Sequence, residues 1–430
     1  MLARFCLYGF LKNQRYHEPF LVLALVEQGH SYLDVGLLIG FRELCVNLLE
    51  IPSGAIADLY GRRRAMIAAF VAYIAAFLLL ASAPGLGLLF AAMGLYAVGE
   101  AFRSGTHKAM IFTWLKKQGR EDEKAEVYGR TRSWSKRGSA VAALVAAAIA
   151  WMTGDFSGVL WFTAIPYTLG LINLATYPRW LDGEVSAAAR RPLEVVRVTA
   201  RGLAAAVRIP GLRRLLGESM AFEGSHKLAR EYLQPLVEAA ALGLPVFGAV
   251  GVLGILGAGD DLDFRRTVIA LSLVYFVLGL IEGAASRRAG AFGRRFGAAA
   301  IATLWRLNLA GFAVLLFALV GGWAWLAIVA FVLQTGALQN LFRPLQLARY
   351  DDHTPPELQA TVLSIEAQGK ALVVAAAAPV VGWLIDRGAA EEAAAVDPAS
   401  LWPVAALGLL LALVAVARGR GRPPAAPTAA

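Results

Sequence analysis

Charged side chains lie in the middle of otherwise apolar segments of this chain, and they are its best candidates for chemistry. A charge at the centre of a membrane costs about 2.5–3.5 kcal/mol on insertion scales, so such residues persist only when paired or facing water or a polar ligand. One polar run crosses the first apolar segment and comprises Lys12, Asn13, Gln14, Arg15, His17 and Glu18. Pro19 follows it, so we expect a kinked and nearly broken helix there.

Other charged residues repeat at helical spacing, which places each set on one face of a helix. These sets are Glu100 with Arg103 and His107, Glu223 with Lys227 and Arg230, and Glu366 with Lys370. The second segment holds Arg42 and Glu43, with Asn47 and Glu50 on the face of Glu43. Basic side chains of this kind can hold anionic groups, and acidic ones can carry protons. The alternative is a lattice of buried ion pairs, or, for a histidine, a hydrogen-bonded packing role. For the set as a whole we favour function, because buried pairs rarely repay their desolvation through stability alone.

The elements that must position these residues are membrane helices. The 430 residues are 58% hydrophobic and 17% charged, and the mean hydropathy is +0.58, which is too apolar for a soluble protein of this length. Most apolar runs are about 20 residues long, enough to cross a hydrocarbon core of about 30 Å. We expect twelve spans, at 4–26, 34–56, 65–84, 87–113, 137–153, 158–177, 213–240, 266–286, 298–320, 323–347, 361–385 and 400–417.

The basic residues fix an expected orientation. They gather in alternate connections, around residues 62–64, 116–137, 179–214 and 287–295, and in the tail after 417. By the positive-inside rule these connections and both termini are cytoplasmic. The net charge of +10 therefore reflects topology and gives no reason to expect nucleic acid as a partner. The two cysteines, Cys6 and Cys45, both lie in apolar segments and suggest neither a disulfide framework nor a metal site.

Three stretches lie outside the expected spans. Residues 179–212 form a polar, basic linker whose apolar residues recur at helical spacing, so they predict an amphipathic helix on the anionic inner leaflet or a solvated linker helix. The Gly-rich stretch 241–263 predicts a re-entrant or interfacial excursion. Residues 419–430, rich in Pro, Ala and Gly, predict a disordered cytoplasmic tail.

The two halves of the chain echo each other. Lys12 and Arg15 recur as Lys227 and Arg230, in both cases 215 residues further on. A glutamate also precedes a Gly-Arg-Arg triplet by eleven residues in each half, at Glu50 and at Glu282. An internal repeat of this kind is typical of transporters built from two related bundles.

Residues 54–63 join the second and third expected spans. Within them the residues that fit a Gly-x-x-x-Asp-basic-x-Gly-Arg-basic pattern are Gly54, Asp58, Gly61, Arg62 and Arg63, while Leu59 departs from it. The pattern resembles the signature loop of the major facilitator superfamily of secondary transporters. The preceding run from Glu50 to Gly54 resembles a group of mostly uncharacterised bacterial permeases within it.

The resemblance implies an all-α fold of twelve transmembrane helices in two pseudo-symmetric six-helix bundles, here residues 1–178 and 213–418. It implies that helices 1, 4, 7 and 10 line a central cavity and that Asp58 meets the N-terminus of helix 11 as a conformational lock with the rest of the signature loop. The plain alternative for Arg62 and Arg63 is topology anchoring. We expect substrate contacts from Lys12, Asn13, Arg15, Arg103, Lys227 and Arg230. We expect proton coupling or ion pairing from Glu18, Arg42, Glu43, Glu100, His107, Glu223, Glu366 and Lys370.

The expected function is secondary active transport of a polar, charged small solute by alternating access, with protons as the candidate coupling ion. We expect a monomer in a bacterial inner membrane, with no enzymatic activity, cofactor or metal. No phosphate loop for an ATP-driven motor occurs. A proton-driven exporter of drugs or metabolites is the alternative, weakened because 137–153 contains no Pro. A non-transporting scaffold or sensor on the same fold is the other, and it predicts that all cavity charges are mutually paired.

Overall fold

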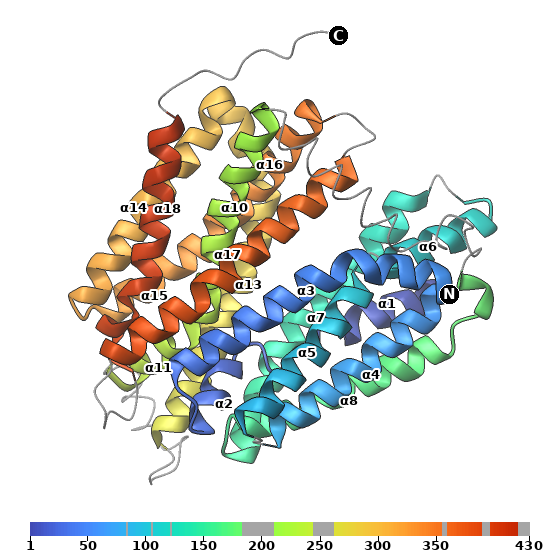
Figure 1. Ribbon diagram of the computed structural model, residues 1–430, viewed down its shortest axis with the longest axis horizontal. Coiled ribbons are helices and arrows are strands. Elements are labelled where there is room, and N and C mark those ends of the chain that lie inside the picture. Colours follow the sequence, from blue (N-terminus) through green and yellow to red (C-terminus); the bar gives the residue numbers. More distant parts are fainter. Residues whose placement is uncertain are drawn as a thin grey trace. The chain divides into compact units, whose positions relative to one another are not determined.

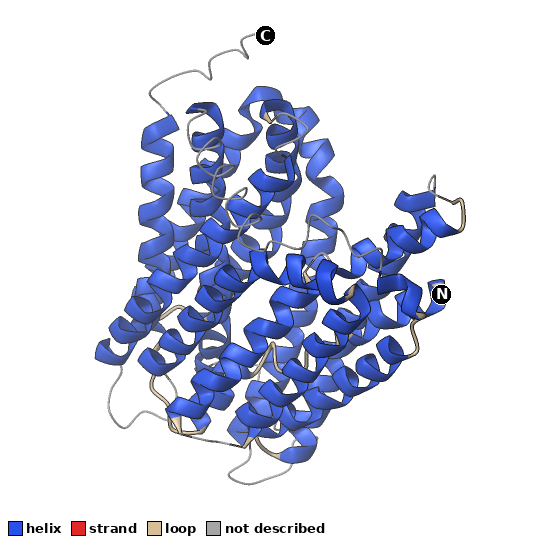
Figure 2. Ribbon diagram, turned by 45° about the vertical axis from the view of Figure 1, so that its right-hand side comes forward, coloured by secondary structure: helices blue, strands red, loops and turns tan. Residues whose placement is uncertain are grey.

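The computed structural model describes residues 1–82, 85–104, 106–120, 123–182, 210–243, 262–354, 359–388 and 396–419. Within these ranges the regular elements are helices, and no strand occurs among them (Figure 2). The predicted all-α class is therefore confirmed. The predicted amphipathic linker helix, the excursion at 241–263 and the tail lie largely outside the described residues.

The chain divides into two compact units, and Figure 1 labels their helices. The first unit comprises Met1–Gly29 and Phe41–Thr199. Its described helices are α1 (Leu2–Leu11), α2 (Leu21–Glu27), most of α3 (Tyr32–Tyr60), α4 (Arg62–Ala81), α5 (Leu86–Arg103), α6 (Thr106–Lys117), α7 (Lys124–Thr153), α8 (Ser157–Ala175) and the short η2 (Arg179–Asp182).

The second unit comprises His30–Gly40 and Ala200–Ala430. Its described helices after the start of α3 are α10 (Pro210–Glu231), α11 (Leu233–Gly243), α13 (Leu262–Phe296), η4 (Gly297–Ala299), α14 (Ala300–Val320), α15 (Ala324–Val332), η5 (Leu333–Leu338), α16 (Gln339–His353), α17 (Gln359–Gly388), η7 (Pro398–Leu401) and α18 (Trp402–Gly419).

Four of the twelve expected spans are interrupted helices. The first breaks between α1 and α2, the fourth between α5 and α6, and the seventh between α10 and α11. The tenth runs through α15, the π-helical turn η5 and α16. The other eight fall on single helices in the described residues. Backbone irregularity is tolerated at membrane depth only where protein or a cavity surrounds it, so these four spans carry the positions most suited to a site.

Seven described helical stretches are long and apolar enough to cross a membrane on length and composition alone. Those that fall short include α3, α7 and α10, which hold many of the charged residues. The same side chains that make a site therefore weaken the hydropathy of the helices that carry them.

Each unit has its own buried core. In the first, Tyr73 on α4 contacts Phe70, Phe77, Tyr96 and Tyr167, with ring centroids 5.0–6.3 Å apart. In the second, one cluster gathers Phe222 of α10, Leu304 and Trp305 of α14, Phe342 of α16 and Ala412 of α18.

The first turns of α3 belong to the second unit because they pack directly on α17. A Cβ at Gly36 would overlap the Ala378 carbonyl oxygen, and one at Gly382 would overlap that of Tyr32, so only glycine allows this approach. The Asp386 carboxylate accepts hydrogen bonds from the backbone N–H of Tyr32 at 2.9 Å and of Leu33 at 2.7 Å. These are orphan donors at the start of α3, and a carboxylate there also complements the helix dipole. The expected boundary between halves therefore does not follow sequence order at this point.

We predict that Asp386→Ala lowers the free energy of unfolding by about 0.5–2 kcal/mol, the usual cost of losing a helix N-cap. Thermal unfolding of the purified protein in detergent measures the change. Asp263→Ala is the matched control, because the Asp263 side chain is 65% exposed and pairs only with Arg266 within the contacts described. Equal effects of the two substitutions would contradict a capping role for Asp386.

Candidate functional site

The break in the first span positions its polar run. Between Leu11 and Leu21 the backbone leaves the helix, as the run of polar residues predicts. Two side chains satisfy nearby backbone groups: Asn13 Nδ2 donates to the Gly9 carbonyl at 2.7 Å, and Gln14 Nε2 donates to the Gly138 carbonyl at 3.0 Å. The second of these bonds ties the break to α7.

Glu100 is the acidic centre of the first unit. Its carboxylate pairs with Arg103 on the same helix and lies 3.9 Å from Arg15 Nη2. The Tyr73 hydroxyl donates to Glu100 Oε2 at 2.5 Å and accepts from Arg103 Nε at 3.2 Å. Two guanidinium groups thus share the Glu100 carboxylate.

The remaining polar residues predicted in this unit have local partners. Arg42 Nη2 lies 3.1 Å from Glu43 Oε1, and its guanidinium carbon is 5.8 Å from the centroid of the Tyr96 ring. His107 stacks on Tyr8 with ring centroids 3.7 Å apart, and its Nε2 is 3.3 Å from the Tyr177 hydroxyl. These contacts suit a packing histidine, and a coupling role for His107 stays a prediction.

A cavity of about 390 Å³ lies in the first unit between α1, the α5–α6 junction and α7. Basic side chains that line it are Lys12, Arg103, Lys108, Arg132 and Lys136. Among the described residues of its wall none is acidic. Aromatic rings of Phe5, Tyr8 and Tyr128 and the hydroxyls of four serines and threonines complete the lining. Three predicted substrate residues, Lys12, Asn13 and Arg103, therefore meet here.

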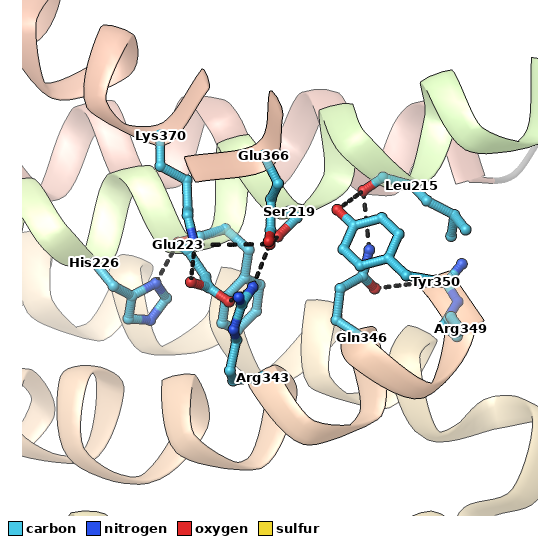
Figure 3. Close-up of polar contacts among 11 residues, drawn as sticks. Leu215, Ser219, Glu223, His226, Arg343, Gln346, Arg349, Tyr350, Glu366 and Lys370 are labelled. Carbon is cyan, nitrogen blue, oxygen red and sulfur yellow. Dashed lines mark hydrogen bonds and ion pairs between the residues drawn. The ribbon is translucent and has the colours of Figure 1, made fainter. Parts of the chain in front are cut away.

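The second unit contains a network of ion pairs (Figure 3). Arg343 Nη1 of α16 donates to Glu223 Oε1 at 3.1 Å and also pairs with Glu366 of α17. Lys370 Nζ lies 2.8 Å from Glu223 Oε2 and 3.7 Å from Glu366 Oε1. The Ser219 hydroxyl donates to the same Glu366 oxygen. The predicted residues Glu223, Glu366 and Lys370 are therefore brought together, with two acids balanced by two bases.

Within that network Glu366 is buried and asymmetric. Its side chain is fully buried, Oε1 accepts all the hydrogen bonds described for it, and Oε2 has no hydrogen-bond partner. A buried oxygen without a donor costs free energy.

Other predicted residues of the second unit lie along α10. Arg230 Nη1 is 2.6 Å from Glu282 Oε1 of α13. Lys227 is half-buried on the same helix, and Glu18 is half-buried in the break of the first unit. Whether Lys12, Arg15, Lys227 and Arg230 face one another stays a prediction, because the two units are described separately.

The signature loop is held from within the first unit. Gly61 has a φ of 103°, which favours glycine, at the start of α4. The Arg63 backbone N–H donates to Asp182 Oδ1 of η2 at 2.8 Å, and Arg62 Nη1 donates to the Thr113 hydroxyl at 3.0 Å. Gly54 lies in the last turns of α3, and the Asp58 side chain lies outside the described residues. The lock at helix 11 therefore stays a prediction.

Sequence reasoning missed several residues of these sites. Arg343 was not a candidate, because it lies near the expected end of a span, where an arginine suggests anchoring. Arg132 and Lys136 were missed because the basic stretch 116–137 was assigned to a loop. Lys108 was missed because it does not follow the i, i+3, i+7 spacing that links Glu100, Arg103 and His107 in the same span. The helical spacing of Arg132 and Lys136, four residues apart and followed by Ser139, is the signal that could have identified a helix face.

No metal centre is evident in the described residues, since no group of three or more His, Cys, Asp or Glu side chains is placed to hold an ion.

Solved structures of membrane transporters share this all-helical architecture. The nucleoside transporter NupG aligns over 98% of this chain and 99% of its own, with a TM-score of 0.76 and 12% identity. A peptide transporter POT, solved as a point mutant, aligns over 97% of this chain and 94% of its own with a TM-score of 0.65 and 14% identity. A D-xylose-proton symporter aligns over 96% of both chains with a TM-score of 0.59 and 18% identity. At these identities the likeness shows the fold alone.

The sequence profile of the Major Facilitator Superfamily matches residues 3–366, and the chain belongs to that family of transporters. Among curated relatives, the multidrug resistance protein MdtH of Yersinia pestis (strain Pestoides F) is 28% identical over 165 residues, 38% of each chain. The uncharacterised MFS-type transporter YxaM of Bacillus subtilis (strain 168) is 25% identical over 105 residues, 24% of this chain and 25% of its own. The match thus spans less than two fifths of either relative.

We predict that Arg343→Gln lowers the free energy of unfolding by about 3 kcal/mol, because it leaves two buried carboxylates with only Lys370. The value is at the low end for a broken buried pair because 34% of the Arg343 side chain is exposed. The double variant Arg343→Gln/Glu366→Gln should recover much of this loss. Denaturant unfolding of the purified variants measures both changes.

Arg306→Gln, which replaces an exposed arginine of α14, is the control and should change stability little. A single variant as stable as the parent, or a double variant no more stable than the single one, would contradict the charge balance inferred for the network.

Proposed function

We propose that this transporter moves a small anionic solute and binds it in the cation-lined cavity of the first unit. Solute binding in this cavity would be one step of an alternating-access cycle. The observation that carries the proposal is the composition of the wall: five basic side chains and, among its described residues, no acidic one.

Physical reasoning connects that wall to an anion. Like charges gathered at one cavity repel one another and create a positive potential that attracts an anion. Counter-charges within the protein would relieve this, as they do in the second unit. In the described chain no ion pair joins the side chains of Lys12, Arg132 or Lys136 to a carboxylate. A bound anion would supply the missing counter-charge.

The alternatives fit the same observations less well. A non-transporting scaffold requires cavity charges that are mutually paired, and the wall of this cavity is not balanced in that way. Drug export is favoured by the partial match to a relative named as a multidrug resistance protein. An exporter of lipophilic cations would need acidic or apolar walls, whereas this wall is basic.

We further propose that a proton is the coupling ion and that Glu366 carries it. The fully buried carboxyl has one oxygen engaged by Ser219 and Arg343 and one without a donor. Protonation of Glu366 would leave Arg343 and Lys370 facing Glu223 alone, so the charge of the network would change by one. A change of that size in a buried network can shift a conformational equilibrium several-fold or more.

The orientation in the membrane, the cytoplasmic position of both termini, the bacterial inner membrane and the monomeric state remain predictions of the sequence. Lys227 and Arg230 remain predicted solute contacts on the same basis.

We expect Lys12→Gln and Lys136→Gln each to weaken binding of small organic anions about tenfold, since a hydrogen bond to a charged group contributes about 1.5–3 kcal/mol. The dissociation constants are measured on purified protein with a panel of carboxylates, sulfonates and phosphate esters. Lys117→Gln is the matched control, because the Lys117 ammonium lies 4.2 Å from the Trp180 ring centroid and does not line the cavity. Anion binding that is unaffected by both cavity variants would argue against this site.

Glu366→Gln should abolish uptake driven by an imposed pH gradient in proteoliposomes while preserving exchange of solute for solute. The neutral amide cannot gain or lose the proton, but it retains an acceptor for Ser219 and Arg343. Glu218→Gln is the control, because Glu218 pairs with Arg214 and Arg349 outside the network. Gradient-driven uptake that persists in Glu366→Gln would exclude Glu366 as the proton carrier.

A further inference from the structure

The basic side chains of the cavity differ in the partners that they already contact. Arg103 pairs with Glu100, so an anion in the cavity would have to share this guanidinium group with the Glu100 carboxylate. Lys108 lies over the rings of Phe112 and Tyr128, with its nitrogen 5.5 and 5.4 Å from their centroids. For Lys12, Arg132 and Lys136 no ion pair with a carboxylate occurs in the described chain. Three basic side chains of the wall therefore have neither a carboxylate nor an aromatic ring as a described partner.

These three side chains belong to two helices that are pressed together. Arg132 and Lys136 are four residues apart on α7 and so share one face. Lys12 caps the end of α1, and α1 packs on α7 through glycine: a Cβ at Gly9 would lie 2.9 Å from the Thr131 carbonyl oxygen. The three cations therefore line the same cavity and would contact the same bound ligand.

The charges around Lys12 are repulsive on balance. Arg103, Arg15 and Arg132 are all close enough to repel its ammonium electrostatically. Glu100 attracts it, but that carboxylate already serves Arg103 and Arg15. An anion in the cavity would relieve the repulsion that remains.

The hydroxyls beside these cations do not supply the missing anion contacts. Thr131 donates its proton to the Tyr128 carbonyl at 2.8 Å, Ser135 donates to Thr131 O at 3.3 Å, and Ser139 donates to Ser135 O at 3.3 Å. Their protons are used within α7. On this wall of α7 the donors left for a bound anion are therefore the ammonium and guanidinium groups.

From this arrangement we propose that the transported solute carries a dianionic phosphate monoester, bound by Lys12, Arg132 and Lys136; this rests on the proposed anion transport. A phosphate monoester presents three acceptor oxygens and a charge near −2. An arginine can bind two of those oxygens at once, and each lysine acts as a point charge. A carboxylate has two oxygens and one charge, so it would leave cations of this wall unmatched.

The size and remaining lining of the cavity are consistent with an organic ester. A volume of about 390 Å³ lies within the range of small-molecule sites. The stacked rings of Tyr8 and His107 and the ring of Phe5 form an aromatic part of the wall. Phenyl phosphate is therefore a suitable probe, and phenyl sulfate is its matched partner, with nearly the same shape, three terminal oxygens and a single negative charge.

The test compares the dissociation constants of the two probes on the purified full-length protein. At about pH 8 the phosphate is dianionic, because its second pKa is about 6, and we expect phenyl phosphate to bind at least about tenfold more tightly than phenyl sulfate. At about pH 5 both probes are monoanions and the ratio should fall towards one. Because each ratio is taken on one protein at one pH, effects of pH that act equally on the two probes cancel.

Variants show which side chains distinguish phenyl phosphate from phenyl sulfate. Arg132→Gln and Lys136→Gln should each reduce the phosphate-to-sulfate ratio at about pH 8, while Lys117→Gln should leave it unchanged. Equal binding of the two probes by the parent protein would overturn the dianion assignment and leave anion transport standing. Failure of every anion in the wider panel to bind would overturn both.

Counterflow in proteoliposomes distinguishes a transported solute from a lipid phosphate, which offers the same chemistry. Proteoliposomes preloaded with phenyl phosphate should accumulate labelled phenyl phosphate from outside. Tight binding without counterflow would assign the cavity to a lipid headgroup or another ligand that is not transported, and would overturn the proposal.

Discussion

The cost of burying charge in an apolar medium is the constraint on which this structure depends. A carboxylate or ammonium group that is taken out of water must be paired with an opposite charge. Otherwise its burial destabilises the fold by several kcal/mol. The second unit satisfies this demand internally, since Glu366 is fully buried but lies among Arg343, Lys370 and Ser219. The cavity of the first unit has no such internal balance: the described part of its wall holds five basic side chains and no acidic one, and Lys108, Arg132 and Lys136 are exposed there. This gathering of cations at one cavity is the reason we propose it as the site of an anionic ligand.

The same constraint explains where the helices break. Backbone groups that leave a helix at membrane depth need other partners, and side chains such as Asn13 and Gln14 provide them. Interruptions fall in the first, fourth, seventh and tenth spans, the four that the family resemblance leads us to expect around a central cavity. The first and seventh spans break close to the repeated Lys-x-x-Arg motif in both units. The internal repeat is therefore visible in backbone geometry as well as in sequence.

Hydropathy and spacing predicted the spans, the break after Lys12 and the shared face of Glu366 and Lys370, because these depend on residues close in sequence. The pairing of Arg343 with two acids could not be predicted, since it joins α16 to α10 and α17 and depends on how those helices pack. The cavity wall was missed for another reason. α7 begins at Lys124, well before its apolar part, so residues assigned to a loop form a regular helix that carries Arg132 and Lys136. Apolar length marks the membrane-embedded part of a helix and not its ends.

The central claim is that the cation-lined cavity of the first unit holds the solute. An experimental structure of the protein with bound phenyl phosphate tests it most directly. The account predicts density for the phosphate group within hydrogen-bond distance of Lys12 and of Arg132 or Lys136, with the phenyl ring against the aromatic part of the wall. Density for the probe at a site that these side chains do not reach, with the cavity of the first unit empty, would contradict it.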